Sequence, residues 1–228
     1  MVPRSVEDAP ARRSLGVKPA ALLAILLLAA SAQALEVNLD AYRDARRAGA
    51  LGAMAGRAVA EPRSLSAAAQ PLTGTIVAVL PRSEALMARL ERLKEGARES
   101  STAFAAAAPA MRRTREAYER ELWEAGAPDL TPTVLVDAEG GFRIDDLPAG
   151  AWLVFAWRTM LVDVSGEKLK ARERSLFLSR ARLRGFQSVT IWLRAVELAG
   201  GATARIELTD RNAWFRGVVE ERAPDTGR

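Results

Sequence analysis

The 228-residue chain contains no histidine and no cysteine. Without them it cannot build a Ser-His triad, a cysteine nucleophile or a disulfide bond, and it has no imidazole or thiolate ligand for a metal ion. An enzyme made from this chain would have to work with carboxylates, lysine, tyrosine or serine. We therefore expect no catalytic residues, no metal and no cofactor.

Lysine is scarce as well, because arginine supplies nearly all of the 33 basic residues. The formal net charge is +5, and charges of both signs are mixed along the chain. This mixture lacks the concentrated basic patch that nucleic acid binding needs, so we expect no nucleic acid partner. With 49% hydrophobic and 27% charged residues, the composition is that of a globular protein.

The N-terminal 34 residues have the pattern of a secretory signal peptide. A polar, basic start is followed by an uncharged apolar run over residues 20–31 and by the small-residue motif Ala32-Gln33-Ala34. The run is shorter than the roughly 20 residues that span a bilayer as a helix. We expect a signal helix at 1–34 that is cleaved, no stable membrane span afterwards, and a protein in the periplasm or outside a bacterial cell.

Residues 35–72 are predicted to be an N-terminal arm and linker. Asn38 is a suitable cap for a short helix with apolar residues at helical spacing. Gly49, Gly52 and Gly56 then weaken the pattern, and residues 60–72 have the composition of a linker.

Residues 82–127 are predicted to form a helical hairpin. They are rich in Ala, Leu, Glu and Arg and carry two apolar stripes at helical spacing. These stripes are Leu86, Leu90, Leu93 and Ala97 on one helix, and Met111, Tyr118, Leu122 and Ala125 on the other. Because Pro109 disfavours an unbroken helix, the helices should join near residues 106–109 or near 100–102.

The remainder of the chain alternates apolar and polar residues with the period of a β-strand. The expected strands are 73–80, 133–137, 142–145, 151–159, 186–198, 204–208 and 215–219, with a loop at 165–174. Residues 151–159 are apolar on both sides, so both faces of that strand should be covered. The pattern predicts a mainly β protein, an antiparallel β-sandwich over 73–221, with a flexible tail at 222–228.

One segment resembles a known family. Gly140-Gly141, Phe142, Ile144, Leu147-Pro148 and Gly150 follow the turn, strand and turn pattern of carboxypeptidase regulatory-like domains. The resemblance covers residues 73–81 and 127–219, and it implies a transthyretin-like sandwich in which 73–77 is the first strand. The family has a short loop where this chain has residues 82–127. The expected fold is thus a transthyretin-like antiparallel β-sandwich with an inserted helical hairpin.

Four tryptophans fall in the β region, and an exposed one could stack on a sugar ring or on a partner protein. Trp192 is the best candidate, because Thr190 and Arg194 flank it on the face of its strand that looks polar. The corner before the last strand adds Arg211 and Trp214. We predict a binding surface made of Trp192, Arg194, Trp214 and Arg211.

The sequence leaves three functional hypotheses open. The favoured one is an exported, non-catalytic module that binds a protein or a cell-surface glycan. The second is a carboxylate-dependent hydrolase or a Ca²⁺ site that uses Asp137, Glu139, Asp145 or Asp146, although such residues also bind the backbone of their own turns. The third is a scaffold whose helical hairpin oligomerises with another chain.

Overall fold

The computed structural model describes residues 36–62, 64, 68–162 and 183–222. The predicted signal peptide at 1–34, the predicted loop at 165–174 and all of the predicted tail except Arg222 lie outside these residues. Residues 35–228 belong to one compact unit.

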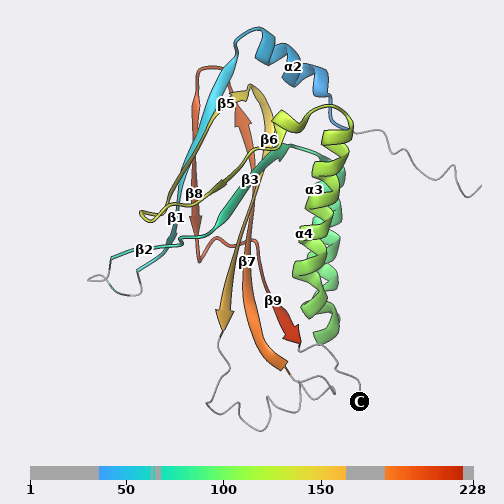
Figure 1. Ribbon diagram of the computed structural model, residues 1–228, viewed down its shortest axis with the longest axis vertical. Helices are drawn as coiled ribbons and strands as arrows, with labels where there is room; N and C mark the ends of the chain where they lie inside the picture. Colours follow the sequence, from blue (N-terminus) through green and yellow to red (C-terminus); the bar gives the residue numbers. More distant parts are fainter. Residues whose placement is uncertain (1–35, 63, 65–67, 163–182, 223–228) are drawn as a thin grey trace, which may run out of the picture. The chain divides into compact units, whose positions relative to one another are not determined.

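Two β-sheets form the body of this unit (Figure 1). The first sheet contains β1 (Leu51–Ala60), β2 (Gln70–Pro71), β5 (Gly141–Pro148) and β8 (Thr203–Thr209). The second sheet has the order β4 (Thr133–Leu135), β3 (Ile76–Pro81), β6 (Gly150–Val162), β7 (Leu183–Leu198) and β9 (Phe215–Arg222). The protein is mainly β, as the sequence predicted, and β3 joins the later strands in one sheet across the intervening helices.

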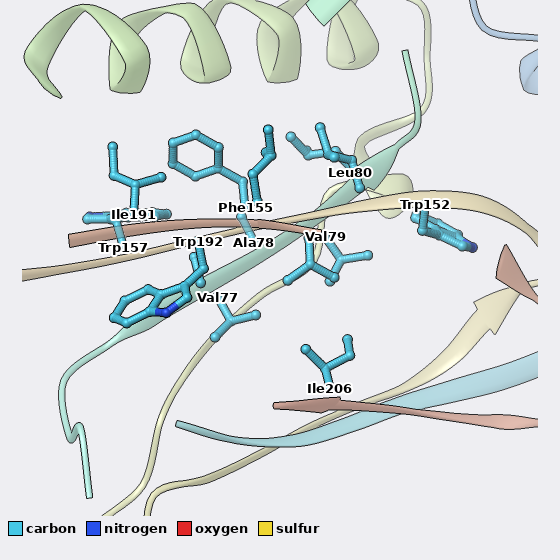
Figure 2. Close-up of a cluster of buried hydrophobic side chains, with 14 of the residues drawn as sticks. Val77, Ala78, Val79, Leu80, Trp152, Phe155, Trp157, Ile191, Trp192 and Ile206 are labelled. Atoms are coloured by element: carbon cyan, nitrogen blue, oxygen red, sulfur yellow. The ribbon is translucent and has the colours of Figure 1, made fainter. Parts of the chain in front are cut away.

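Opposite faces of the second sheet are buried against different layers. Figure 2 shows Val77, Val79 and Trp192 on the face toward the first sheet, where Ile206 of β8 projects toward them. Phe155 and Ile191 lie on the other face, toward the helices. Residues 152–157 of β6 are therefore buried without interruption, which confirms the prediction that both faces of this strand are covered.

The helical layer consists of α3 (Glu84–Gly96) and α4 (Ser101–Glu124). The hydroxyl oxygens of Ser83 and Ser100 accept hydrogen bonds from the first-turn N–H groups of Leu86 and Ala103, at 3.1 and 3.0 Å. The helices therefore join at residues 97–100, close to the second of the two predicted positions. Pro109 lies within α4 and does not end it.

Polar side chains attach the helices to the strands and to one another. The Tyr118 hydroxyl donates to the Pro81 carbonyl at 3.0 Å, which fixes α4 against the end of β3. Burial raises the pKa of this tyrosine, so its hydroxyl keeps its proton and donates at any physiological pH.

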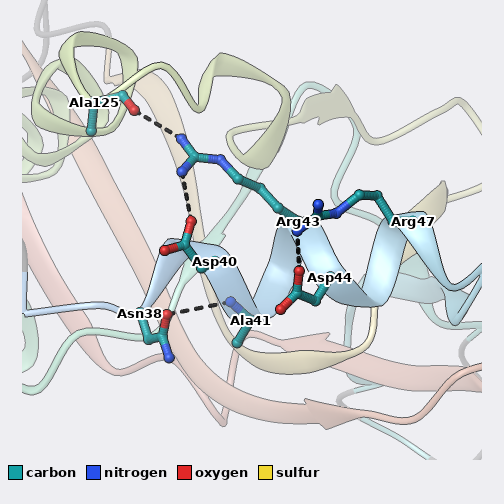
Figure 3. A network of polar contacts seen from close by, with 7 residues as sticks. All are labelled: Asn38, Asp40, Ala41, Arg43, Asp44, Arg47 and Ala125. Carbon is teal, nitrogen blue, oxygen red and sulfur yellow. Dashed lines mark hydrogen bonds and ion pairs between the residues drawn. The ribbon is translucent and has the colours of Figure 1, made fainter.

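The short helix α2 (Leu39–Arg47) is capped by Asn38, whose side-chain oxygen accepts from the Ala41 N–H at 3.3 Å. Arg43 of α2 donates to Asp40 at 2.9 Å and to the Ala125 carbonyl, at the end of α4, at 3.0 Å (Figure 3). The sequence thus predicted this helix and its cap correctly, and the helix is attached to α4.

The prediction of an arm and linker at 35–72 is wrong over residues 51–60. These residues form β1, the central strand of the first sheet, which pairs with β2 and β5 antiparallel and with β8 parallel. The parallel pair also corrects the expectation of a purely antiparallel sandwich. Glycine is required at two positions of β1, because the turn between β7 and β8 lies very close to Gly52 and β8 lies very close to Gly56. A Cβ atom at Gly52 would lie 2.7 Å from the Ala202 carbonyl oxygen.

The turn at 137–141 is present, but its role differs from the hairpin that the sequence indicated. Gly140 has φ of 83°, and its N–H donates to the Asp137 carbonyl at 3.2 Å. The strands on either side lie in different sheets, since β4 pairs with β3 while β5 pairs with β1. The turn therefore carries the chain from one sheet to the other.

We expect Gly56→Ala to destabilise the protein. The added Cβ would overlap the Ile206 carbonyl oxygen and the ring of Phe142, and the backbone of β8 cannot move without breaking its pairing with β1. Overpacking of this kind costs about 1–3 kcal/mol. Urea unfolding should show a lower midpoint with an unchanged slope. Gly96→Ala is the matched control, because a Cβ at Gly96 meets no atom within 4 Å and its midpoint should not fall.

Candidate functional site

The corner between β8 and β9, residues 209–214, is held by a dense set of hydrogen bonds. The Asn212 side-chain oxygen accepts from the Thr209 N–H at 2.9 Å, and the Thr209 hydroxyl accepts from the Asn212 N–H at 3.2 Å. The Asn212 side-chain amide also donates to the Glu207 carbonyl at 2.9 Å. Because its backbone is fixed in this way, the corner can present side chains in a defined arrangement.

Trp192 lies beneath this corner and not on the surface, so the prediction of an exposed ring is wrong. Its side chain is 1% exposed, and its indole N–H donates to the Thr209 carbonyl at 2.7 Å. The face of β7 that carries Thr190, Trp192 and Arg194 looked polar in the sequence. The first sheet covers this face at Trp192, which fills the space between the two sheets.

The two predicted arginines both belong to the corner. Arg194 is half-buried and donates to the Asn212 carbonyl at 3.0 Å. Arg211 is exposed and forms an ion pair with Glu61 at 3.0 Å. The Glu61 N–H in turn donates to the Asp210 carboxylate at 2.7 Å, so the corner is tied to the chain that follows β1.

Trp214 is half-buried, and its side chain contacts the helical layer. The indole N–H donates to the Glu91 carboxylate at 2.7 Å, and the Lys94 ammonium lies 4.7 Å from the ring centroid. Lys94 and Glu91 also form an ion pair at 3.4 Å. The sequence missed these two residues of α3. Their spacing of i and i+3 placed them on one helix face, but nothing indicated that the face would meet Trp214.

The four predicted residues therefore all lie at one corner, but Trp192 is not available to a ligand. Trp192 is core, Arg211 contacts the chain after β1, and Trp214 contacts α3. We define the corner site as Arg194, Arg211, Trp214, Glu91 and Lys94. It offers an aromatic ring, cationic donors and one carboxylate acceptor, which are the groups that hydrogen-bond and stack on polar ligands.

The carboxylates that the hydrolase hypothesis needed are exposed and serve their own turns. Asp137 accepts from the Glu139 and Gly141 N–H groups, at 3.0 and 2.6 Å. Asp145 forms an ion pair with Arg143 at 2.6 Å, while Asp146 adopts a left-handed conformation with φ of 58°. Glu139 is exposed as well. Within the described residues, no three acidic side chains are grouped so that they could hold a metal ion.

Among the described carboxyl groups, only Glu119 on α4 has a pKa raised above its usual value. Burial raises it, and the nearby Arg115 guanidinium opposes this by lowering it. Burial also lowers the pKa of Arg115, which is only 6% exposed and lies 4.5 Å from the Trp157 ring centroid. This pair lies between α4 and the second sheet, where it joins two layers of the fold.

The helical stripes that the scaffold hypothesis needed are largely buried within this chain. Four of these stripe residues are each at most 2% exposed and belong to the hydrophobic core of the described chain: Leu86, Leu90, Met111 and Leu122. Of the predicted stripe residues, Ala125 is exposed and Leu93 is partly buried. The described part of the chain also has no helix of the length and apolarity that crossing a bilayer would require.

Comparison with known proteins gives little guidance. No family model matches the chain, and no curated protein matches it. Three solved chains match. One of them is the crystal structure of a Pseudomonas aeruginosa protein that is described provisionally as carbohydrate-binding. It is 14% identical with a TM-score of 0.37, and the match covers 70% of this chain and 88% of that chain. An overlap this loose transfers neither a fold nor a function.

Proposed function

We propose that the protein is an exported, non-catalytic β-sandwich module that binds a protein or a cell-surface glycan through the corner site. Its place is the periplasm or the outside of a bacterial cell, after removal of residues 1–34. In this proposal the sandwich is of the carboxypeptidase regulatory-like kind, with the helical hairpin as an insertion.

The observation that carries the proposal is the environment of Trp214. Its half-buried indole is held by Glu91 and lies beside the Lys94 ammonium, on a corner whose backbone is fixed by Asn212. An aromatic ring in a fixed orientation, with charged donors and acceptors at its edge, binds sugars or side chains at a low entropic cost. The absence of histidine and cysteine from the whole sequence removes the commonest catalytic groups and supports a binding role.

A binding screen with a matched variant tests this function. The purified protein is applied to a glycan array and used to isolate partners from a cell-surface extract, and each hit is then measured with the purified ligand. We expect Trp214→Ala to weaken binding at least tenfold. Trp123→Ala is the control, because Trp123 is 60% exposed on α4 and donates to Thr131, which is no part of the corner site, so this variant should bind as the unchanged protein does.

Two results would count against the proposal. Equal binding by the Trp214→Ala variant would remove the corner from the site. Rapid turnover of a small substrate by the pure protein would replace the binding module with an enzyme.

A further inference from the structure

The second sheet is longer than the first, so part of its inner face is not covered by the residues that the structure describes. Trp192 donates to the carbonyl of Thr209, the last residue of β8, and therefore marks the level at which the first sheet ends. The strands β6, β7 and β9 continue beyond this level (Figure 1). Side chains there that point the same way as Trp192 face away from the helices, and no sheet of the described chain lies opposite them.

Thr190 is the next residue of β7 on that face, since side chains two apart on a strand point the same way. The strand register places Arg158 of β6 directly opposite Thr190 on one side and Arg216 of β9 opposite it on the other. The following row along the strands is Met160, Ser188 and Val218. We call these six residues the ledge.

Neutral groups hold both arginines of the ledge. Arg158 donates from Nε to the Thr73 carbonyl at 3.3 Å and from Nη1 to the Met160 sulfur at 2.9 Å. Arg216 donates to the Asp210 carbonyl. Among the residues whose side chains the structure describes, no carboxylate lies within ion-pair distance of either guanidinium, whereas Arg82 has two such carboxylates and Arg211 has one.

The two positive charges therefore remain uncompensated by the described chain. A guanidinium has five N–H donors, so each arginine keeps donors for a ligand after these bonds. The two Cα positions are separated by two strand spacings, about 10 Å, with the Thr190 hydroxyl between them. At this separation, the long side chains of both arginines can donate hydrogen bonds to one anion from opposite sides.

We propose that the ledge binds carboxylate groups of an acidic glycan, such as a chain of uronic acid units. This assignment rests on the proposed binding function and names its ligand class. Arginine recognises a carboxylate through two parallel hydrogen bonds, and the Thr190 and Ser188 hydroxyls can donate to and accept from sugar hydroxyls. An acidic protein fits less well, because protein interfaces depend on buried aromatic or arginine anchors in an apolar centre. The ledge has no aromatic side chain, and its one exposed large apolar residue is Met160.

The test measures binding of the purified full-length protein to three probes: polygalacturonate, neutral dextran and poly-glutamate. We expect polygalacturonate to bind with a salt-dependent affinity and the neutral polymer to bind at least tenfold more weakly. Arg158→Ala combined with Arg216→Ala should reduce polygalacturonate binding at least tenfold. The control is Arg57→Ala combined with Arg205→Ala, which removes the same charge from exposed positions of the first sheet and should change binding less than twofold.

A second variant protects the test against a folding defect. Arg158→Gln combined with Arg216→Gln removes both charges while keeping a donor for the Thr73 and Asp210 carbonyls, and its unfolding midpoint should match that of the unchanged protein. It should lose polygalacturonate binding to the same extent as the alanine pair.

The possible results separate the ledge from the corner site. If both double variants still bind polygalacturonate, the proposal that the ledge binds acidic glycans is wrong. Trp214-dependent binding of a protein or a neutral glycan, without any affinity for polygalacturonate, overturns the ledge and leaves the proposed function intact. Equally tight poly-glutamate binding that depends on the two arginines replaces the glycan with an acidic protein. Failure to bind any glycan or protein overturns both.

Discussion

Replacing Trp192 with alanine is expected to lower the free energy of unfolding by about 3–5 kcal/mol, the usual cost of removing a buried large aromatic side chain. Trp192 is 1% exposed and lies between the two sheets beneath the corner. Its loss leaves a void between the two sheets and removes the hydrogen-bond donor of the Thr209 carbonyl. Denaturant unfolding should show a clearly lower midpoint.

Two further tryptophan variants separate the causes of this loss. Trp192→Phe keeps most of the ring volume and removes the indole N–H. We expect it to lose less stability than Trp192→Ala does, and this loss reports mainly on the hydrogen bond to Thr209. Trp123→Ala makes the same chemical change at a side chain that is 60% exposed, and we expect little change in stability. A loss at Trp123 as large as that at Trp192 would contradict the assignment of Trp192 to the core.

The misassignment of Trp192 began with β1. Residues 51–60 contain six glycine or alanine residues and only three larger apolar ones, and such a segment lacks the alternation that identifies a strand. Its small residues are required because the backbone of the turn between β7 and β8 approaches Gly52 closely, and the backbone of β8 approaches Gly56. That requirement arises from tertiary packing, and a pattern based on local propensity cannot detect it.

Without β1 there was no sheet to cover the face of β7 that contains Trp192. Thr190 and Arg194 made that face look polar, yet both have reasons to be there that only the structure reveals. Arg194 donates to the corner at Asn212, and Thr190 lies beyond the end of the first sheet. The strands with strong alternation or long apolar runs, such as β6, were predicted correctly, because their signal comes from burial on a regular pleat.

The corner site was partly accessible from the sequence. The run from Asp210 to Trp214 has the residues of a corner, and this pattern predicts Arg211 and Trp214 as parts of a binding surface. Glu61, Glu91 and Lys94 lie far away along the chain and reach the corner through the packing of α3 and the end of β1. Long-range partners of this kind cannot be inferred from spacing within one segment.

The second large effect concerns the buried ion pair between α4 and the second sheet. Arg115 pairs with Glu119, lies 3.6 Å from the Glu116 carboxylate and stacks near Trp157. Arg115→Met would leave Glu119 without its closest cation, although its side chain is only 17% exposed. Removing one partner of a buried pair costs about 3–5 kcal/mol because the other charge stays buried, so we expect a loss in this range at neutral pH.

The pH dependence identifies the cause of this loss. Burial raises the pKa of Glu119 in the folded protein, so the folded state holds this proton more tightly than the unfolded state does. Ionisation of Glu119 therefore costs stability. The cost is absent below the unfolded pKa and complete above the folded one. Arg115 lowers the pKa of Glu119, so its removal raises that pKa further and enlarges the cost at neutral pH. The deficit of Arg115→Met should shrink as the pH falls through the acidic range.

A double variant completes the argument. Arg115→Met combined with Glu119→Met removes both charges, and we expect it to recover most of the stability that Arg115→Met alone loses, because apolar replacements of buried pairs are often neutral. The Arg115 Nε has no hydrogen-bond partner among the described residues. The hydrogen bonding of this pair is therefore incomplete, so replacing both residues with methionine should cost little stability. Unfolding curves of the single and double variants at pH 4 and pH 7 measure both effects. An equal deficit for the single variant at the two pH values would assign the loss to packing against Trp157 and not to the unpaired charge of Glu119.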